Sequence, residues 1–261
     1  MKFIHISDLH ILPRPQTIRG IDVCARLDAA VASITANFAD AELVMVTGDM
    51  TDSGDAESYA EARRILDRLP MPWHTLMGNH DGRDSHARTV LSHLPWQADG
   101  SLQYALETPA GRFIALDSSI SGKDSGRLTP ARLTWLRDQL TSARAAGTDV
   151  YLFMHHVPFD IGIDWLDEIK FENGDELRDV LKDFDNIRHM FMGHIHRPTH
   201  GSWHGIPYST VYSTSHQVAL QFGREQLHIE ENPCYAVVLI KDHHVLVHDH
   251  SFLEERRPRT L

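Results

Sequence analysis

The stretch KFIHISDLH, residues 2–10, is a short apolar run that ends in an aspartate and a histidine. Lys2–Ile6 has the length and the Ile and Phe content of a β-strand, and Asp8 and His10 follow it, separated by one residue. Extended backbone repeats its side-chain direction every second residue, so both side chains can turn toward one point. The stretch therefore predicts a strand whose carboxyl end carries a pair of metal-ligand side chains.

The same arrangement recurs further along the chain. The runs Glu42–Thr47, Trp73–Met77, Val150–Met154 and Arg188–Met192 have strand length, and Gly48-Asp49, Gly78-Asn79-His80-Asp81, His155-His156 and Gly193-His194-Ile195-His196 follow them in turn. The carboxyl ends of parallel strands meet at one edge of a sheet, where ligands bind. We therefore expect these motifs and Asp8-Leu9-His10 to lie together, with the glycines allowing the backbone to approach closely.

Helical patterns separate several of these strands. Apolar residues spaced by three or four positions predict one helix over residues 23–38, and others are predicted near Ala56–Leu69, from Thr129-Pro130 to Gly147, and over Asp175–Phe184. Strands that alternate with helices predict parallel pairing with helices on both faces, the layered α/β architecture. The sequence thus places the chain in the α/β class.

Three parts of the chain depart from this alternation. Leu102–Glu107 and Arg112–Asp117 are predicted to form a hairpin, and the end of the chain is rich in strands, predicted at Ile206–Ser213, Tyr235–Ile240 and Val245–His250. The polar stretch from Ser215 to Pro233 has no clear period and is interpreted as an insertion or cap. The irregular segment Phe159–Asn173 is expected to overhang the same side.

Composition narrows the class of partner. The chain of 261 residues has 25 Lys and Arg against 36 Asp and Glu, a net charge of −11, and its basic cluster is Arg256-Arg257-Pro258-Arg259. A nucleic-acid polymer requires a broad basic surface, so we predict no such partner. No apolar run approaches the roughly 20 residues that span a membrane, so no membrane partner is predicted either.

The same composition suggests a compartment. The start of the chain lacks the apolar core of a signal peptide. Cys24 and Cys234 allow at most one disulfide, and whether they pair is left open. We therefore predict a cytoplasmic protein.

The chain has nineteen histidines, many of them in the strand-end motifs, and this excess indicates a chemical role. Imidazole, carboxylate and amide donors without thiolate suit two divalent or trivalent first-row ions such as iron, manganese, cobalt or zinc, which geometry alone does not separate. The sequence contains no GxSxG elbow, Walker A loop or HExxH helix. Serine acyl transfer, P-loop phosphoryl transfer and zincin proteolysis therefore lack their signatures.

The ordered series D-x-H, GD, GNHD, HH and GHxH, from Asp8 to His196, resembles the calcineurin-like dinuclear metallophosphoesterase superfamily. Met154-His155-His156, Glu172-Asn173-Gly174 and His216-Gln217-Val218 are similar to its bacterial branch of class III cyclic-nucleotide phosphodiesterases and glycerophosphodiesterases. The resemblance implies a four-layer α/β/β/α sandwich. It implies a metallophosphoesterase core over residues 1–198. The remaining core strands and a strand-rich cap or oligomerisation segment, at about 215–233, would occupy residues 199–261.

Carried over by position, the resemblance implies a role for each motif residue. One metal would be held by Asp8, His10 and His196, and the other by Asn79, His155 and His194. Asp49 would bridge the two ions. His80 would face the substrate phosphate or leaving group, and His216, with Asn79 and His80, would help to hold the phosphate.

The implied activity is hydrolysis of small phosphodiesters, either cyclic nucleotides or glycerophosphodiesters. Two cations that share Asp49 would activate a water for in-line attack, and His80 would protonate the leaving alkoxide or stabilise its charge. A phosphomonoesterase or nucleotide pyrophosphatase is the alternative, although a monoester favours extra basic residues and Arg197 is the one obvious candidate. A non-catalytic metal-binding scaffold is the alternative of another class. The resemblance further implies a homo-oligomer built through the segment after Ser215.

Three neighbours of these motifs are predicted to be structural. His156 follows a ligand and should point the opposite way, Asp81 should orient its own loop, and His5 should lie in the core of the first strand.

Overall fold

The computed structural model describes residues 1–81, 85–242 and 244–253, which excludes the basic cluster at residues 256–259. Its first sheet begins with β1 (Lys2–Ile6), which pairs in parallel with β2 (Leu43–Val46), and β3 (Trp73–Thr75) extends the sheet beyond β2. On the other side of β1, β12 (Cys234–Lys241) and β13 (His244–Ser251) add in antiparallel orientation. The strand order is β13-β12-β1-β2-β3.

A second sheet has the order β4-β5-β6-β7-β9-β8. The hairpin of β4 (Tyr104–Thr108) and β5 (Gly111–Ala115) confirms the predicted antiparallel pair. β6 (Val150–Met154), β7 (Ile187–Met192) and β9 (Ile206–Thr210) then continue in parallel, and β8 (His200–Trp203) closes the edge in antiparallel orientation. β8 was not predicted, because His200–Trp203 has no apolar alternation.

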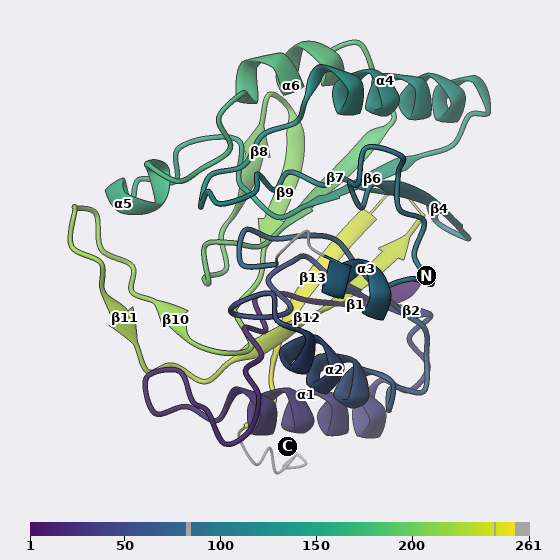
Figure 1. Ribbon diagram of the computed structural model, residues 1–261. Helices are drawn as coiled ribbons and strands as arrows, with labels where there is room; N and C mark the ends of the chain where they lie inside the picture. Colours follow the sequence, from purple (N-terminus) through teal and green to yellow (C-terminus); the bar gives the residue numbers. More distant parts are fainter. Residues whose placement is uncertain (82–84, 243, 254–261) are drawn as a thin grey trace, which may run out of the picture.

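Each sheet is covered by helices on its outer face (Figure 1). α1 (Val23–Asn37) and α2 (Ala56–Leu66) cover the first sheet, whereas α4 (Pro130–Ala145) and α6 (Gly174–Leu181) cover the second. The helix starts follow the predicted chemistry, since the Thr129 side chain accepts a hydrogen bond from the backbone of Arg132 at 3.3 Å, with Pro130 in the first helical position. Two short helices, α3 (Ser85–Val90) and α5 (Asp164–Asp167), lie in connecting segments.

The inner faces of the two sheets pack on each other through aromatic side chains. The ring of Phe3 on β1 lies 5.2 Å from that of Phe113, 5.8 Å from that of Phe153 and 5.3 Å from that of Phe191. Successive side chains of β6 point into two different hydrophobic cores. Phe153 joins the core between the sheets, and Leu152 joins the core beneath α4 and α6.

The expected parallel pairing is observed for several strands, but the expectation of helices on both faces of a sheet is wrong, because each sheet packs on the other with its inner face. The residues on both faces of β6 are apolar, so both faces must be covered. The hydrophobic periodicity of the strand does not distinguish a helix from a second sheet as the covering layer. The four-layer sandwich implied by the resemblance is confirmed.

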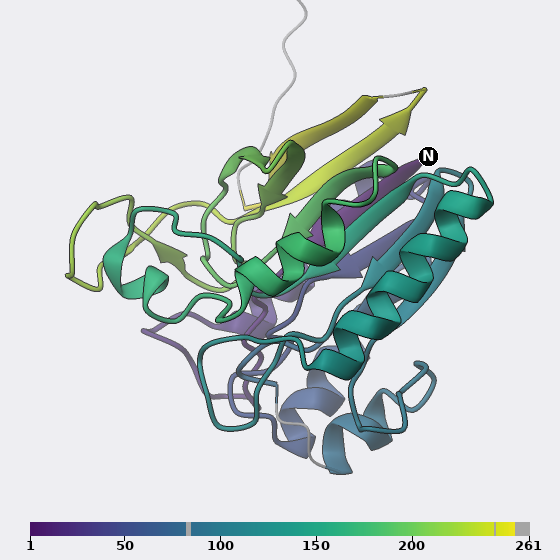
Figure 2. The ribbon, with the colours of Figure 1, turned by 90° about the horizontal axis from the view of Figure 1, so that it is seen from above.

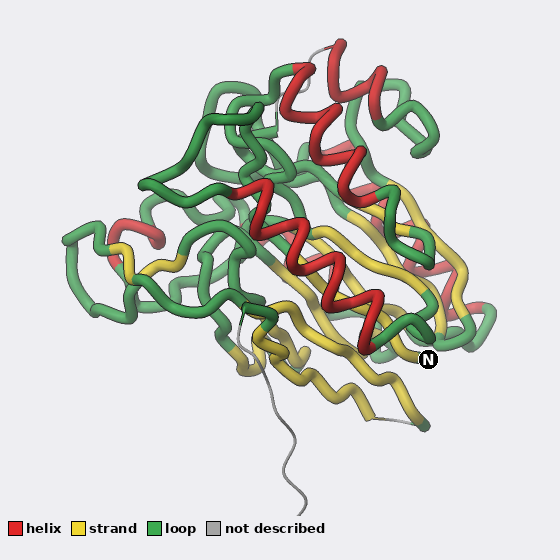
Figure 3. The backbone as a smooth tube through the Cα atoms, turned by 90° about the horizontal axis from the view of Figure 1, so that it is seen from below, coloured by secondary structure: helices red, strands yellow, loops and turns green. Residues whose placement is uncertain are grey.

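The segment predicted as a cap forms a small hairpin of β10 (Gln217–Val218) and β11 (His228–Ile229). It lies with α5 at the end of the sandwich that is opposite the amino terminus (Figure 2). Seen from below, the same end consists mostly of loops, while strands fill the middle of the molecule (Figure 3). Cys24 and Cys234 do not form a disulfide with each other. Within the described residues, no helix has both the length and the apolar character needed to cross a bilayer.

Candidate metal centre

The strand-end motifs converge at this loop-rich end of the sandwich, as the sequence predicted. Asp8 and His10 follow β1, Asp49 follows β2, and the segment after β3 supplies Asn79. His155 follows β6, and the loop after β7 supplies the remaining two histidines, His194 and His196. We call these seven residues the ligand cluster.

The first half of the cluster surrounds Asp49. His10 Nε2 lies 3.0 Å from His196 Nε2 and 3.5 Å from Asp49 Oδ2, and His196 Nε2 lies 3.4 Å from Asp8 Oδ1. Ligand atoms of Asp8, His10, Asp49 and His196 all lie within 4.8 Å of one another. All four residues are buried.

The second half surrounds Asn79. Its Oδ1 lies 3.0 Å from His155 Nε2 and 3.0 Å from His194 Nδ1. His155 Nε2 is also 3.2 Å from Asp49 Oδ2, the same oxygen that His10 approaches. Asp49 therefore stands between the two halves, in the position of a bridging ligand.

The far nitrogen of each histidine fixes which nitrogen faces the centre. Nδ1 of His10 donates to Asp52 Oδ1 at 3.0 Å, and Nδ1 of His196 donates to the carbonyl of His216 at 2.9 Å. In the other half, His155 Nδ1 donates to the Thr47 carbonyl at 2.7 Å and His194 Nε2 to the Ile169 carbonyl at 3.1 Å. Because carboxylates and carbonyls only accept hydrogen bonds, these nitrogens carry the ring hydrogens.

Each of these rings, when neutral, therefore presents the lone pair of its inward nitrogen to the centre. In one half two such lone pairs face each other, and in the other half two face the Asn79 carbonyl oxygen. These contacts repel unless positive charge lies among them. The donor set of imidazole, carboxylate and amide oxygen thus fits two first-row divalent or trivalent ions that share Asp49.

The electrostatics of the carboxylates support the same conclusion. Burial raises the pKa of Asp8 and Asp49, but the neighbouring imidazoles of His196 and His155 leave both pKa values below the ordinary range. Burial lowers the pKa of His155, yet the carboxylate of Asp49 reverses this and raises it to about 9. Two ionised carboxylates thus draw positive charge into a buried site, which is what metal ligands require.

The backbone of the cluster is strained. Five of its residues are not glycine and still have positive φ: Asp8 (54°), His10 (46°), Asp49 (49°), His194 (72°) and His196 (52°). Each such conformation costs roughly 1–3 kcal/mol and persists where the surrounding structure imposes it. Gly48 explains part of this constraint, because a Cβ at that position would lie 2.6 Å from His155 Nδ1. The predicted close approach of backbone at the glycine before Asp49 is confirmed.

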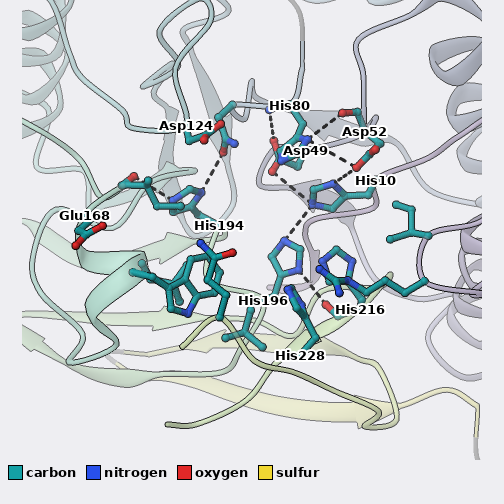
Figure 4. A pocket seen from close by; sticks show the side chains of 18 residues that line it. His10, Asp49, Asp52, His80, Asp124, Glu168, His194, His196, His216 and His228 are labelled. Atoms are coloured by element: carbon teal, nitrogen blue, oxygen red, sulfur yellow. Dashed lines mark hydrogen bonds and ion pairs between the residues drawn. The ribbon is translucent and has the colours of Figure 1, made fainter. Parts of the chain in front are cut away.

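A cavity of about 470 Å³ opens over the cluster (Figure 4). His80 lies at its edge, with its backbone N–H donating to Asp49 Oδ1 at 2.9 Å and its Nδ1 donating to the carbonyl of Asp52 at 2.9 Å. Burial lowers the pKa of His80, but Asp49 and Asp52 outweigh it and leave the pKa raised. The ring therefore holds a proton more readily than an ordinary histidine.

His216 also lines the cavity, on the His196 side. Its Nδ1 is 3.0 Å from the hydroxyl oxygen of Ser215, and its ring centroid is 4.5 Å from that of His196 and 5.4 Å from that of His10. Burial, followed by the nearby imidazoles, lowers the pKa of His216 to about 2. His216 is therefore a neutral hydrogen-bonding group.

Asp81 and His5 are placed as predicted, but His156 does not point away from the cluster, because its ring lies 4.6 Å from that of His194 and its ligand atom lies within 4.8 Å of those of His155 and His194. His156 lies between Ser118 Oγ, 2.8 Å from its Nδ1, and the Asp124 carbonyl, 3.1 Å from its Nε2. Asp81 accepts from the backbone of Met50, Thr51 and Gly78 and so holds the loops of Asp49 and Asn79 together. His5 is fully buried in β1.

Sequence reasoning missed several residues of the cavity wall. Asp52, which fixes the ring of His10, lies three residues after Asp49, and that spacing was the available signal. Arg19, Asp124, Trp165, Glu168 and His228 also line the cavity, and they come from loops, from α5 and from β11, whose sequence has no recognisable motif. Arg197 does not line it, because its guanidinium donates to the Val218 carbonyl at 2.8 Å.

The two packed mixed sheets with a buried His/Asp cluster at the loop end define a metallophosphoesterase. The family model described as calcineurin-like phosphoesterase matches residues 1–198, and the chain belongs to this family. The family resemblance that the sequence motifs indicated is thereby confirmed.

Relatives agree with the predicted branch. A probable cyclic nucleotide phosphodiesterase of Rhodopseudomonas palustris is 35% identical over 97% of this chain and 93% of its own length. A probable glycerophosphodiester phosphodiesterase, GpdQ, of Arcobacter nitrofigilis is 32% identical over 86% of this chain and 82% of its own length. A dimetal phosphatase structure from Danio rerio shares the fold, with a TM-score of 0.78 over 97% of each chain at 15% identity.

Proposed function

We propose that the chain hydrolyses small phosphodiesters, either cyclic nucleotides or glycerophosphodiesters, in a reaction that depends on two metal ions. The proposal rests on one observation: two groups of inward-facing ligand atoms share Asp49 beneath an open cavity. The two relatives described above are named for cleavage of such diesters. Bound metal ions would activate water and neutralise the phosphoryl oxygens.

The ligand cluster divides into two sets in this proposal. Asp8, His10 and His196 hold one ion, Asn79, His155 and His194 hold the other, and Asp49 belongs to both. The outward hydrogen bonds of the histidines keep their inward nitrogens aimed at the ions, which preserves affinity. The identity of the ions, iron and manganese with zinc or cobalt as alternatives, stays a prediction.

His80 is the proposed proton donor to the leaving alkoxide. Its Nδ1 is held by the Asp52 carbonyl, and among the described residues no protein group bonds to its Nε2, so that atom is available to the substrate. Proton donation at this point contributes about 10²- to 10⁴-fold to the rate. Asn79 and His216 help His80 to hold the phosphate.

Charge favours a diester over a monoester. Arg197, the basic residue that a monoester would need, is bound to the Val218 carbonyl and lies outside the cavity wall. The dianion of a monoester would therefore not meet the guanidinium of Arg197, whereas a diester carries only one negative charge.

The test compares bis(p-nitrophenyl) phosphate with p-nitrophenyl phosphate, using protein stripped of metal and reconstituted in turn with manganese, iron, cobalt and zinc. We expect metal-dependent cleavage of the diester and little cleavage of the monoester. Preference for the monoester would replace this proposal with a phosphatase. If neither substrate reacts with any of the metals, the chain is a scaffold.

Assembly is a second part of the proposal. Four large apolar side chains of the segment at about 215–233 are exposed, at 59% for Leu220, 74% for Phe222, 41% for Leu227 and 42% for Ile229. We propose that this segment joins copies of the chain into a homo-oligomer. Light scattering that gives a mass of 29.6 kDa at micromolar concentration would contradict it. The domain boundary at residues 198–199 and the cytoplasmic location stay predictions.

A further inference from the structure

One wall of the cavity carries a strained turn with an arginine at its tip. Ile18 and Ile21 exchange backbone hydrogen bonds of 3.0 Å and 2.8 Å, which leaves Arg19 and Gly20 as the two central residues. Both have positive φ, 52° at Arg19 and 81° at Gly20. Asn, Asp and Gly suit the first central position of such a turn, whereas arginine does not. The turn therefore holds a cation at the cavity wall at a cost in backbone energy.

Arg19 differs from the other arginines of its segment. Arg14 forms ion pairs with Asp28 and Glu61, and the guanidinium of Arg26 donates to the carbonyl of Ser215. Arg19 is exposed, and among the described residues it makes no hydrogen bond or ion pair. It is also the only lysine or arginine among the described residues that line the cavity. Its charge is thus available to a ligand.

Acidic and imidazole side chains line different parts of the outer cavity wall. Asp124 and Glu168 lie on the side of His194, while His216 and His228 lie on the side of His196 (Figure 4). Arg19 lines the same cavity as His216 and His228. The ring of Trp165, 6.4 Å from that of His228, adds an apolar surface to this part of the wall.

We infer that Arg19 binds a second negative charge, a carboxylate or phosphate, on the organic group of a diester whose phosphorus lies at the ligand cluster. The inference rests on the proposed function and names its preferred substrate class. A guanidinium donates two parallel hydrogen bonds to such a group and keeps its charge at every relevant pH. The carbon chain between the two charges would lie against Trp165.

The test uses three 4-nitrophenyl phosphodiesters whose second ester group is 2-carboxyethyl, propyl or choline. The leaving group is the same, so only the distant charge changes. In the metal-loaded wild-type protein we expect kcat/KM for the carboxyethyl ester to exceed that for the propyl ester about five- to tenfold, and added salt to reduce this ratio.

Variants identify the residue responsible. The ratio should fall to about one in Arg19→Gln and be largely kept in Arg19→Lys, because lysine retains the charge. Arg14→Gln is the matched control, five positions away on the same segment, and should keep the wild-type ratio. A wild-type ratio near one, a ratio unchanged in Arg19→Gln, or a preference for the choline ester would overturn the inference. A preference for the choline ester would instead indicate that Asp124 and Glu168 bind the second ester group.

A binding measurement separates this inference from the proposed function. Calorimetric titration of metal-loaded protein with 3-phosphonopropionate and with propylphosphonate needs no turnover. We expect the carboxylate compound to bind about five- to tenfold more tightly in the wild type and equally in Arg19→Gln. If no diester is cleaved, the proposed function fails, and the titration still decides whether Arg19 recognises a second negative charge.

Discussion

The ligand cluster and the outer wall of the cavity are built in opposite ways. Six of the seven cluster residues are buried and Asn79 is half-buried, the histidines are each fixed by a second hydrogen bond, and the backbone is strained at five positions. The outer wall comes from loops within residues 11–26, 159–169 and 215–233, and exposed or half-buried Arg19, Trp165 and His228 line it. The strand ends position the ligand cluster, and the outer wall differs in supplying residues that a substrate can contact, although its Ile169 and His216 carbonyls also fix the rings of His194 and His196.

The largest effect should follow from the residue shared by both halves of the cluster. Asp49→Ala removes the charge between two cations, which then repel each other, so we expect metal content and activity to be lost together. Elemental analysis beside diester hydrolysis measures this. Asp160→Asn, an exposed carboxylate outside the cavity, serves as the control. Two equivalents of metal with near wild-type activity in Asp49→Ala would refute the site assignment.

His80 tests whether the cavity edge contributes to chemistry without holding metal. We expect His80→Asn to keep its metal and to lower kcat about 10²- to 10⁴-fold for alkyl leaving groups. The loss should be much smaller for nitrophenolate, which leaves without a proton. Rates across a series of leaving groups measure this dependence. An equal loss for every leaving group would exclude proton donation by His80.

Acidic pH should lower the folding stability of the β-sheet that carries part of the ligand cluster, through a residue outside the cavity wall. His189 on β7 is buried with its Nε2 2.9 Å from Ser209 Oγ, and burial lowers its pKa from 6.5 to about 4. The unfolded chain then binds more protons between these values. The stability contributed by a neutral His189 is thus complete above pH 6.5 and is lost as the pH falls toward 4, by about 1.4 kcal/mol per pH unit.

Denaturant unfolding of wild type and His189→Gln across pH 4 to 8 measures this slope. The variant should lose less stability than the wild type on acidification. Equal pH dependence in the two proteins would show that His189 does not carry the effect.

Trp165 should give the smallest effect and sharpen the contrast. Trp165→Ala removes an aromatic surface of the outer wall, so we expect KM to rise about three- to tenfold with little change in kcat. Steady-state kinetics with a nucleotide or aryl diester measures both constants. The control is Trp135→Ala, a half-buried tryptophan on α4 outside the cavity. A fall in kcat larger than the rise in KM would place Trp165 with the chemistry instead.

Particular elements show how far sequence reasoning reached. The strand before Asp8 was predicted with its observed bounds, because a short apolar run ending in a D-x-H motif depends only on local chemistry. Helix α4 began where Thr129 and Pro130 predicted. By contrast, α5 and the hairpin of β10 and β11 were interpreted as irregular, because they are too short for a periodic signal.

The sequence by itself determined the elements of the sandwich and the residues of the ligand cluster, since strand periodicity and ligand chemistry are properties of residues a few positions apart. The tertiary structure decided what covers each sheet, which nitrogen of each histidine faces the centre, and which loop residues surround the cavity. Arg19 and His216 line the same cavity although they lie nearly two hundred positions apart in the sequence. Such proximity arises from packing between elements, and no local pattern records it.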